Sequence, residues 1–153
     1  MTTIGFTPEE IDTGAPTRSA RLKWVVIVST ALPAGRAANA AICVAGATVR
    51  DVEGLLGPDA VDADGSTHPG LPWAGCSVLA ADAATIAAIR TKAEASEGVY
   101  VAGMSALAQE TRVYDEWLAG MAQSHADDLE YYAVSVVGPK NRVDKIVGRL
   151  PLL

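Results

Sequence analysis

Five consecutive apolar residues, Trp24 to Val28 (WVVIV), place the strongest constraint on how this chain folds. A strand with one solvated face alternates apolar and polar residues, whereas a strand covered on both faces is apolar throughout. This run has the length of a strand and is rich in β-branched residues. It therefore predicts a central strand in a sheet that has helices packed against both faces.

The rest of the chain alternates between segments of helical and of strand character. Further strands are expected at 76–81, 99–102 and 131–137, and helices at 36–56, at 82–96, from 105 onward and at 139–148. The flanking residues agree with these limits, because Asp82 is a good N-cap and Gly148 is a good helix exit. We therefore predict a three-layer α/β/α fold around a small mixed sheet of about four strands.

The helix expected at 36–56 is apolar almost all round, and Gly57-Pro58 is expected to end it. A helix of this kind belongs in the interior of a layered fold, so the pattern predicts burial on most sides. Cys43 lies within this helix and Cys76 opens a strand. Both cysteines are expected to be small core residues in a reducing compartment.

The segment 61–68 (VDADGSTH) alternates around an Asp-Gly pair, which is typical of a tight hairpin turn. Its Asp62-x-Asp64-Gly65 pattern also resembles the middle of a calcium-binding loop. The flanking positions that would need acidic ligands are, however, Ala60 and Leu71. The sequence therefore favours an accessory hairpin over a metal site.

Size and composition are typical of one domain, with 153 residues of which 50% are hydrophobic and 20% charged. We expect this domain at 23–153, preceded by an N-terminal arm at 1–22.

The longest nearly uncharged stretch, 37–49, is too short to span a membrane. The acidic N-terminus does not match a secretory signal, so a cytoplasmic location is expected. No cofactor or metal is expected, because the histidines and cysteines lack ligand spacing.

A net charge of −6 makes nucleic acid an improbable partner, because binding to phosphates needs a basic face. The charges are nevertheless unevenly distributed. Residues 94–130 contain eight carboxylates and a single cation, Arg112, whereas Lys140, Arg142, Lys145 and Arg149 cluster near the end. The basic cluster is expected to be a solvated helix face, and the alternative is an anion-binding patch.

Four stretches, taken in order, resemble a known family. They are RSARLKWVVIV at 18–28, the helix that carries Asn39, VDADG and HPGL within 61–71, and VVGPKNRVDKIVGRLPLL at 136–153. Over nearly the whole chain they resemble the bacterial domain of unknown function 2000 family, which has no established activity to carry over. The last stretch is also similar to the C-terminus of the archaeal and eukaryotic type of peptidyl-tRNA hydrolase. That resemblance implies a similar fold and a homodimer.

The residues that carry catalysis in those hydrolases are mostly absent. Gly35-Arg36 stands in place of the Gly-Lys pair after the first strand, and Asn39 lies near the position of the family's glutamine. The histidine position falls on Ile42 or Cys43, the threonine position falls on Ala133, and the chain has no Asp-Ala-Gly. Ester hydrolysis by the same route is therefore not expected.

Five residues are candidates for ligand binding, and four of them lie around the first strand and its loop. Gly35 and Arg36 open a helix, where free N–H groups and a guanidinium suit an anion, and Asn39 follows in the same helix. Ser29 ends the first strand, where α/β sheets usually bind their ligands. Ser105 lies between a strand and a helix, as in hydrolase nucleophile elbows, but the second glycine of that motif is missing, and a helix N-cap is the favoured role.

These residues lead to a hypothesis about function. The leading one is a non-hydrolase binding or accessory protein with a pocket for a small polar or anionic ligand near the first strand-helix loop. One alternative is a hydrolase of the peptidyl-tRNA hydrolase type with an altered catalytic set. The other is a protein-interaction module that uses the acidic surface between Glu94 and Glu130.

Overall fold

Four strands form one mixed sheet in the computed structural model, which describes residues 3–153. The strands are β1 (Leu22–Ser29), β4 (Ser77–Ala81), β5 (Tyr100–Ser105) and β6 (Tyr131–Pro139), in the order β4-β1-β6-β5. Strand β1 is parallel to β4 and antiparallel to β6, and β5 is antiparallel to β6. The prediction of a small mixed sheet of four strands is confirmed.

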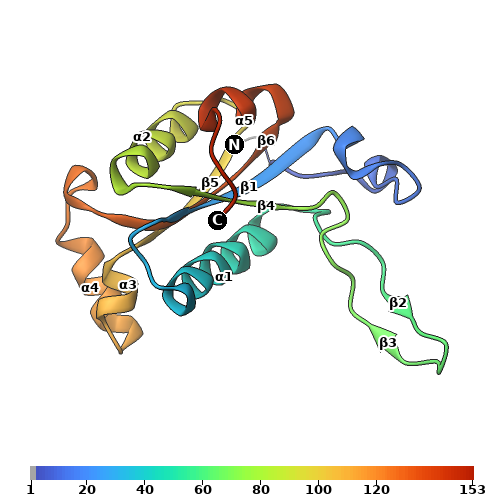
Figure 1. Cartoon of the computed structure of the whole chain (residues 1–153), viewed down its shortest axis with the longest axis horizontal. Helices are drawn as coiled ribbons and strands as arrows, with labels where there is room; N and C mark the ends of the chain where they lie inside the picture. The colour runs from blue at the N-terminus through green and yellow to red at the C-terminus, as the bar shows by residue number, and fades with distance from the viewer. Residues whose placement is uncertain (1–2) are drawn as a thin grey trace.

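Helices cover both faces of this sheet (Figure 1). The α-helices are α1 (Ala34–Asp51), α2 (Ala83–Glu94), α3 (Leu107–Glu110), α4 (Tyr114–Ala122) and α5 (Lys140–Val147). Short 3-10 helices occur at η1 (Pro8–Glu10), η2 (Thr17–Ser19) and η3 (Ala126–Asp128). Helix α1 packs on one face and α2 and α5 on the other, which confirms the three layers. No helix within residues 3–153 combines the length and the apolar character needed to cross a bilayer.

Strand β1 lies in the middle of the sheet, and this position explains its continuous apolar sequence. Trp24, Val26 and Val28 belong to the core under α1, whereas Val25 and Ile27 belong to the core under α2 and α5. All five side chains are buried. Because helices cover both faces of β1, its sequence is apolar throughout and does not alternate with polar residues as a half-exposed strand does.

Helix α1 differs from the expectation of a helix buried on most sides. It ends at Asp51 instead of near Leu56, and its only buried residues are Ala37, Ala40, Val44 and Thr48. The side chain of Ile42 is 70% exposed, and both Cys43 and Cys76 are exposed as well. The predictions of an all-round buried helix and of two core cysteines are therefore wrong. The exposed positions include Arg36, Asn39 and Arg50, so the helix has a polar outer face that its apolar composition conceals.

The helix expected from residue 105 onward is also different in the structure. Ser105 is the last residue of β5, and Ala106 takes the N-cap position of α3. The chain is extended at Thr111, with φ −99° and ψ 153°, so α3 ends there and α4 starts separately. The prediction that Ser105 caps a helix is wrong, because Ser105 pairs with Tyr131 of β6 at a bulge in the sheet.

The limits predicted for α2 and for the end of α5 agree with the structure. The Asp82 side chain accepts a hydrogen bond from the Thr85 N–H, and the inner face of α2 buries Ile86, Ile89 and Ala93. Gly148 has a positive φ of 62° directly after α5, a conformation that favours glycine. Pro139 lies just before this helix instead of in its first turn.

The C-terminal tail covers the open edge of β4. The Ala80 N–H donates to the Pro151 carbonyl at 2.9 Å, and the Leu153 N–H donates to the Val78 carbonyl at 3.1 Å. An uncovered strand edge pairs readily with another chain, so the tail protects the sheet from edge-to-edge association.

Residues 3–21 run along the domain before β1 begins, and residues 1 and 2 of the predicted arm lie outside the described residues. Phe6 is buried, and its N–H donates to the Glu53 carbonyl at 2.9 Å. Glu10 accepts two hydrogen bonds from the Arg21 guanidinium, at 2.5 and 3.0 Å. These bonds lower the pKa of the Glu10 carboxyl from 4.5 to about 2.

This ion pair predicts an acid-sensitive contribution to stability. The Glu10 carboxyl has a lower pKa in the folded state than in the unfolded state, so its ionised form stabilises the fold. This contribution is fully present above about pH 4.5 and is lost as the pH falls toward about 2. Glu10→Gln should therefore lower the melting temperature at neutral pH, and the difference from the wild type should shrink steadily below pH 4.5. Thermal unfolding across this pH range measures it. Arg21→Gln should show the same pH-dependent loss together with a constant loss from its bond to the Gly5 carbonyl. A difference between Glu10→Gln and the wild type that persists undiminished at low pH would contradict the prediction.

The predicted hairpin is present and projects from the domain (Figure 1). Strand β2 (Ala60–Val61) pairs with β3 (Thr67–His68) in an antiparallel ladder. We call residues 57–72 the hairpin extension. Its tip is a turn in which Asp62 Oδ1 accepts the N–H groups of Asp64 and Ser66, at 3.0 and 2.9 Å. This confirms the turn interpretation of the Asp62-x-Asp64-Gly65 pattern.

Candidate functional site

Two of the five predicted site residues lie inside the fold. Ser29 is 1% exposed, and its Oγ accepts the N–H of Ala31 at 3.2 Å. Ser105 is also 1% exposed, and its Oγ lies 3.2 Å from the sulfur of Met121. Both hydroxyls thus have partners within the protein.

Gly35 and Arg36 lie in the exposed first turn of α1. Pro33 precedes this helix as the N-cap without a side-chain cap, and the first turn contains no acidic residue. The Arg36 guanidinium donates from Nε to Gln109 Oε1 at 2.8 Å and lies 5.5 Å from the centre of the Tyr132 ring. Arg36 is therefore held in place by a hydrogen bond and by a cation-π contact.

Gln109 of α3 connects Arg36 with Asn39. Its side-chain nitrogen donates to the Arg36 carbonyl at 2.8 Å and to Asn39 Oδ1 at 3.1 Å. This network ties the start of α1 to α3. The sequence pattern did not indicate Gln109, because its partners lie about seventy residues earlier in the chain.

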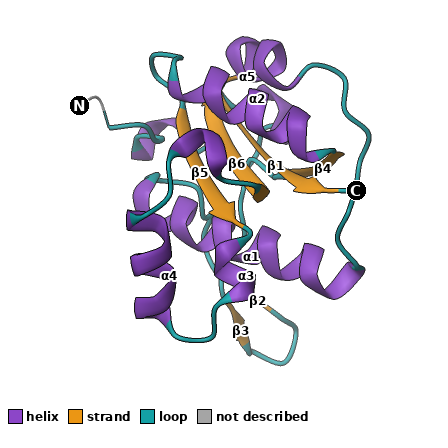
Figure 2. Cartoon of the chain, turned by 90° about the vertical axis from the view of Figure 1, so that its left-hand side faces the viewer, coloured by secondary structure: helices purple, strands orange, loops and turns teal. Residues whose placement is uncertain are grey.

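A cavity of about 590 Å³ lies beside this network. Figure 2 shows α3 and α4 next to α1 at the end of the sheet where β5 finishes. The cavity is lined by Asn39, Cys43, Val44, Ala47, Ala102, Gly103, Met104, Ala108, Thr111, Arg112, Val113, Tyr114 and Trp117. Several of these residues are small, so the space between α1 and β5 is left unfilled. Of the five predicted site residues, Asn39 alone lines the cavity.

The polar groups of the cavity are few and are dominated by one cation. Asn39, Thr111 and Arg112 accompany a mostly apolar lining. No ion pair involving Arg112 occurs among residues 3–153. The thirteen lining residues include no histidine and no carboxylate. In the sequence Arg112 is the lone cation of the acidic region 94–130, and no local pattern there indicates a site.

Two aromatic residues form the α4 side of the cavity. The rings of Tyr114 and Trp117 lie 5.0 Å apart with planes at 58°. The Trp117 Nε1 is buried, and no hydrogen-bond acceptor lies near it within the described part of the chain. Such unpartnered buried donors are rare in folded proteins.

The other end of α1 holds a second polar cluster outside the cavity lining. The Tyr100 hydroxyl donates to Asp51 Oδ2 at 2.8 Å, and Arg50 donates to the same carboxylate at 2.7 Å. Burial and the Asp51 carboxylate raise the pKa of Tyr100 to about 12. Tyr100 is therefore protonated at neutral pH, and its hydroxyl donates the hydrogen bond that joins β5 to the end of α1.

Residues 3–153 contain no group of three or more His, Cys, Asp and Glu side chains placed to share a metal ion. The His68 ring lies 2.9 Å from an Asp62 oxygen, but this contact belongs to the tip of the hairpin extension.

Comparisons with known proteins agree with the fold. One solved structure, of a protein of unknown function (Atu0240) from Agrobacterium tumefaciens strain C58, is similar with a TM-score of 0.80 and 16% identity. The match covers 87% of this chain and 98% of that one, and at this identity it shows the fold alone. No curated protein matches the chain. The family model described as "Protein of unknown function (DUF2000)" matches residues 22–153, and the chain therefore belongs to the DUF2000 family.

Proposed function

We propose that this protein binds a small amphipathic molecule in the cavity between α1, β5 and α4. The anionic group of the ligand pairs with Arg112, and its apolar body lies against Met104 and Trp117. The observation that carries the proposal is a guanidinium without an ionic partner at a cavity that is otherwise mostly apolar. The cavity volume of about 590 Å³ suits a molecule of metabolite size.

The chemistry of the lining favours binding over hydrolysis. General acid-base catalysis needs a group that exchanges protons near neutral pH, most often histidine or a carboxylate. The cavity lining has neither, and its thiol, Cys43, has neither of them beside it in the lining. We therefore infer a binding or accessory role, with the ligand between Asn39 and α4.

The expected homodimer and the cytoplasmic location stay predictions.

A thermal-shift screen of the wild-type protein tests the proposal. The probes are medium-chain carboxylates, aromatic carboxylates and nucleoside monophosphates. A ligand at 100 times its dissociation constant should stabilise the fold by about 2.7 kcal/mol. The same ligand should change the fluorescence of Trp117, and Trp117→Phe should remove that change.

Variants of the lining locate the site. Arg112→Gln should weaken binding of the anionic ligand by about tenfold or more, since it removes a charge-assisted contact worth about 1.5–3 kcal/mol. Ala102→Phe should block binding because its ring fills the cavity. The matched control is Arg149→Gln, which removes an exposed cation that does not line the cavity. This variant should bind the ligand like the wild type.

The outcomes separate the alternatives. Binding that survives Arg112→Gln and Ala102→Phe but is lost in Arg36→Ala would place the anion at the start of α1 instead. Turnover of a hit compound would support the altered hydrolase. No stabilisation by any probe would reject the small-anion proposal and direct attention to protein partners of the acidic surface.

A further inference from the structure

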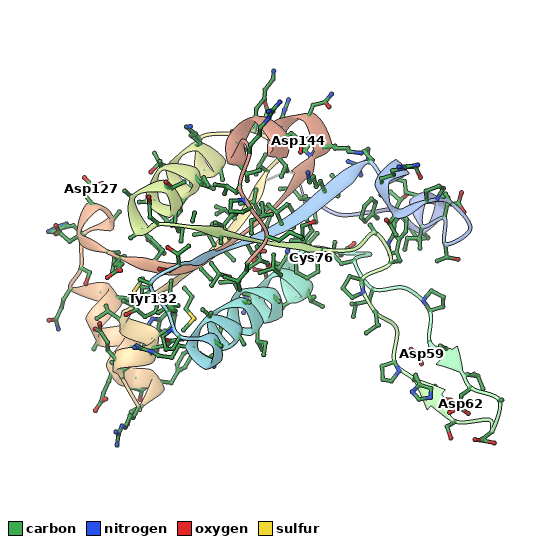
Figure 3. All side chains as sticks on the ribbon, viewed as in Figure 1. Asp59, Asp62, Cys76, Asp127, Tyr132 and Asp144 are labelled. Carbon is green, nitrogen blue, oxygen red and sulfur yellow. The ribbon has the colours of Figure 1, made fainter. Side chains whose placement is uncertain are left out.

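The hairpin extension exposes apolar side chains far from the core. Every residue from 58 to 69 is exposed. Val61 is 67% exposed, and Leu71 near the base is 77% exposed. Figure 3 shows Asp59 and Asp62 on this extension, well away from the two helical layers. These two side chains have no apolar cover within the domain and are available to pack against a partner.

The extension is nevertheless firmly built. At its base the Gly57 N–H donates to the Leu71 carbonyl at 2.9 Å, and Asp59 accepts the Gly70 N–H at 2.9 Å. The two backbones approach so closely that a Cβ on Gly70 would collide with the Gly57 carbonyl. A lone two-stranded hairpin is only marginally stable in water. These contacts order the base of the hairpin, and an element that is ordered in advance loses less entropy on docking.

The extension carries acidic side chains and one histidine, His68, which contacts Asp62 at 2.9 Å. Residues 57–72 include Asp59, Asp62 and Asp64 and no lysine or arginine. The carboxylate of Asp64 accepts no hydrogen bond within residues 3–153, so it is available to a cation of a partner.

One cavity at the base of the extension has a basic lining. This cavity of about 430 Å³ is lined by three cations and no carboxylate, and its other lining includes the stretch 74–77 that leads out of the extension. Lys23 pairs with Asp144 at 2.6 Å. Arg18 and Lys140 have no carboxylate partner among residues 3–153. Figure 3 shows Cys76, another lining residue, where the extension joins the domain.

We propose that the hairpin extension binds a second copy of this chain, with the acidic tip of each extension in the basic cavity at the base of the other. A two-fold axis halfway along two antiparallel extensions brings each tip to the opposite base, so the contact is closed and self-complementary. The exposed apolar side chains of Val61 and Leu71 then lie between the paired extensions. Charge complementarity between tip and base sets the antiparallel orientation.

Sedimentation of the full-length protein over a concentration series tests this arrangement. The wild type should form a dimer. Leu71→Asp should raise the dimer dissociation constant about thirtyfold or more, as expected for loss of an interface anchor. Asp64→Lys and Arg18→Glu should each weaken the dimer, and the double variant should restore it because the charges are exchanged. Ile42→Asp, on the exposed face of α1, is the control and should remain dimeric.

The double variant also separates a lost interface from a damaged fold, because misfolding is not repaired by a second charge reversal. A wild type that is monomeric at every concentration would overturn the proposal. A dimer whose dissociation constant is unchanged in Leu71→Asp and in both charge reversals would overturn it as well. Neither result would affect the ligand proposal, because the two cavities share no lining residue.

Discussion

Ile86→Ala should lower the free energy of unfolding by about 2–5 kcal/mol, the usual cost of truncating a fully buried aliphatic side chain. Ile86 is 0% exposed on the inner face of α2 and belongs to the core that this helix shares with β1, β6 and α5. Its removal leaves a cavity that the surrounding strands cannot close. Urea unfolding monitored by circular dichroism measures the change.

The matched control is the same substitution in α1. Ile42 is 70% exposed, so Ile42→Ala should change the free energy of unfolding by less than about 0.5 kcal/mol. Equal losses in the two variants would show that α1 is buried on its outer face, as its composition alone suggests. They would contradict the arrangement in which α1 packs on one face of the sheet and exposes its outer side.

Ser135→Ala should cost about 1–3 kcal/mol, because it leaves a buried donor without its acceptor. The Trp24 Nε1 donates to Ser135 Oγ at 2.8 Å, and the Thr48 hydroxyl lies 2.7 Å from the same oxygen. Thr48 also donates to the Val44 carbonyl at 2.7 Å. Each hydroxyl has one proton. Because the Thr48 proton is donated to the Val44 carbonyl, the Ser135 hydroxyl donates to the Thr48 oxygen. The resulting chain of hydrogen bonds connects β1, β6 and α1 within the core.

Ser29→Ala is the matched comparison for this prediction. Ser29 is buried as well, but its oxygen accepts the N–H of Ala31, an exposed loop residue that water can reach. Its loss should therefore cost less than the loss of Ser135. Trp24→Phe and Ser135→Ala should be non-additive, since phenylalanine has no N–H to leave unpartnered. Additive free energies in that double-mutant cycle would contradict the hydrogen-bond chain.

Local sequence signals predicted the elements whose limits depend on nearby residues. Asp82 indicated the start of α2, and the Asp-Gly pair at 64–65 indicated the turn of the hairpin extension. The N-cap and turn interactions join residues only two to four positions apart. Contacts between residues so close in the chain can be predicted from the local sequence alone.

The site was predicted only in part. Asn39 was expected near a ligand and lines the larger cavity, whereas Arg112, Thr111 and Trp117 were not included. These residues reach the cavity because α3 and α4 fold back against α1. That approach depends on contacts across the chain, such as the Gln109 bond to Asn39, which no local pattern encodes.

The sequence by itself determined the alternation of strands and helices, the central place of β1 and the hairpin with its turn. Each of these rests on side-chain periodicity or on backbone preferences of a few adjacent residues. The tertiary structure decided which stripe of α1 is buried, where the cavity lies, and how far the hairpin extension projects. Those features depend on which distant segments pack together, as in the bond between Gln109 of α3 and Asn39 of α1, and patterns of a few adjacent residues do not encode such contacts.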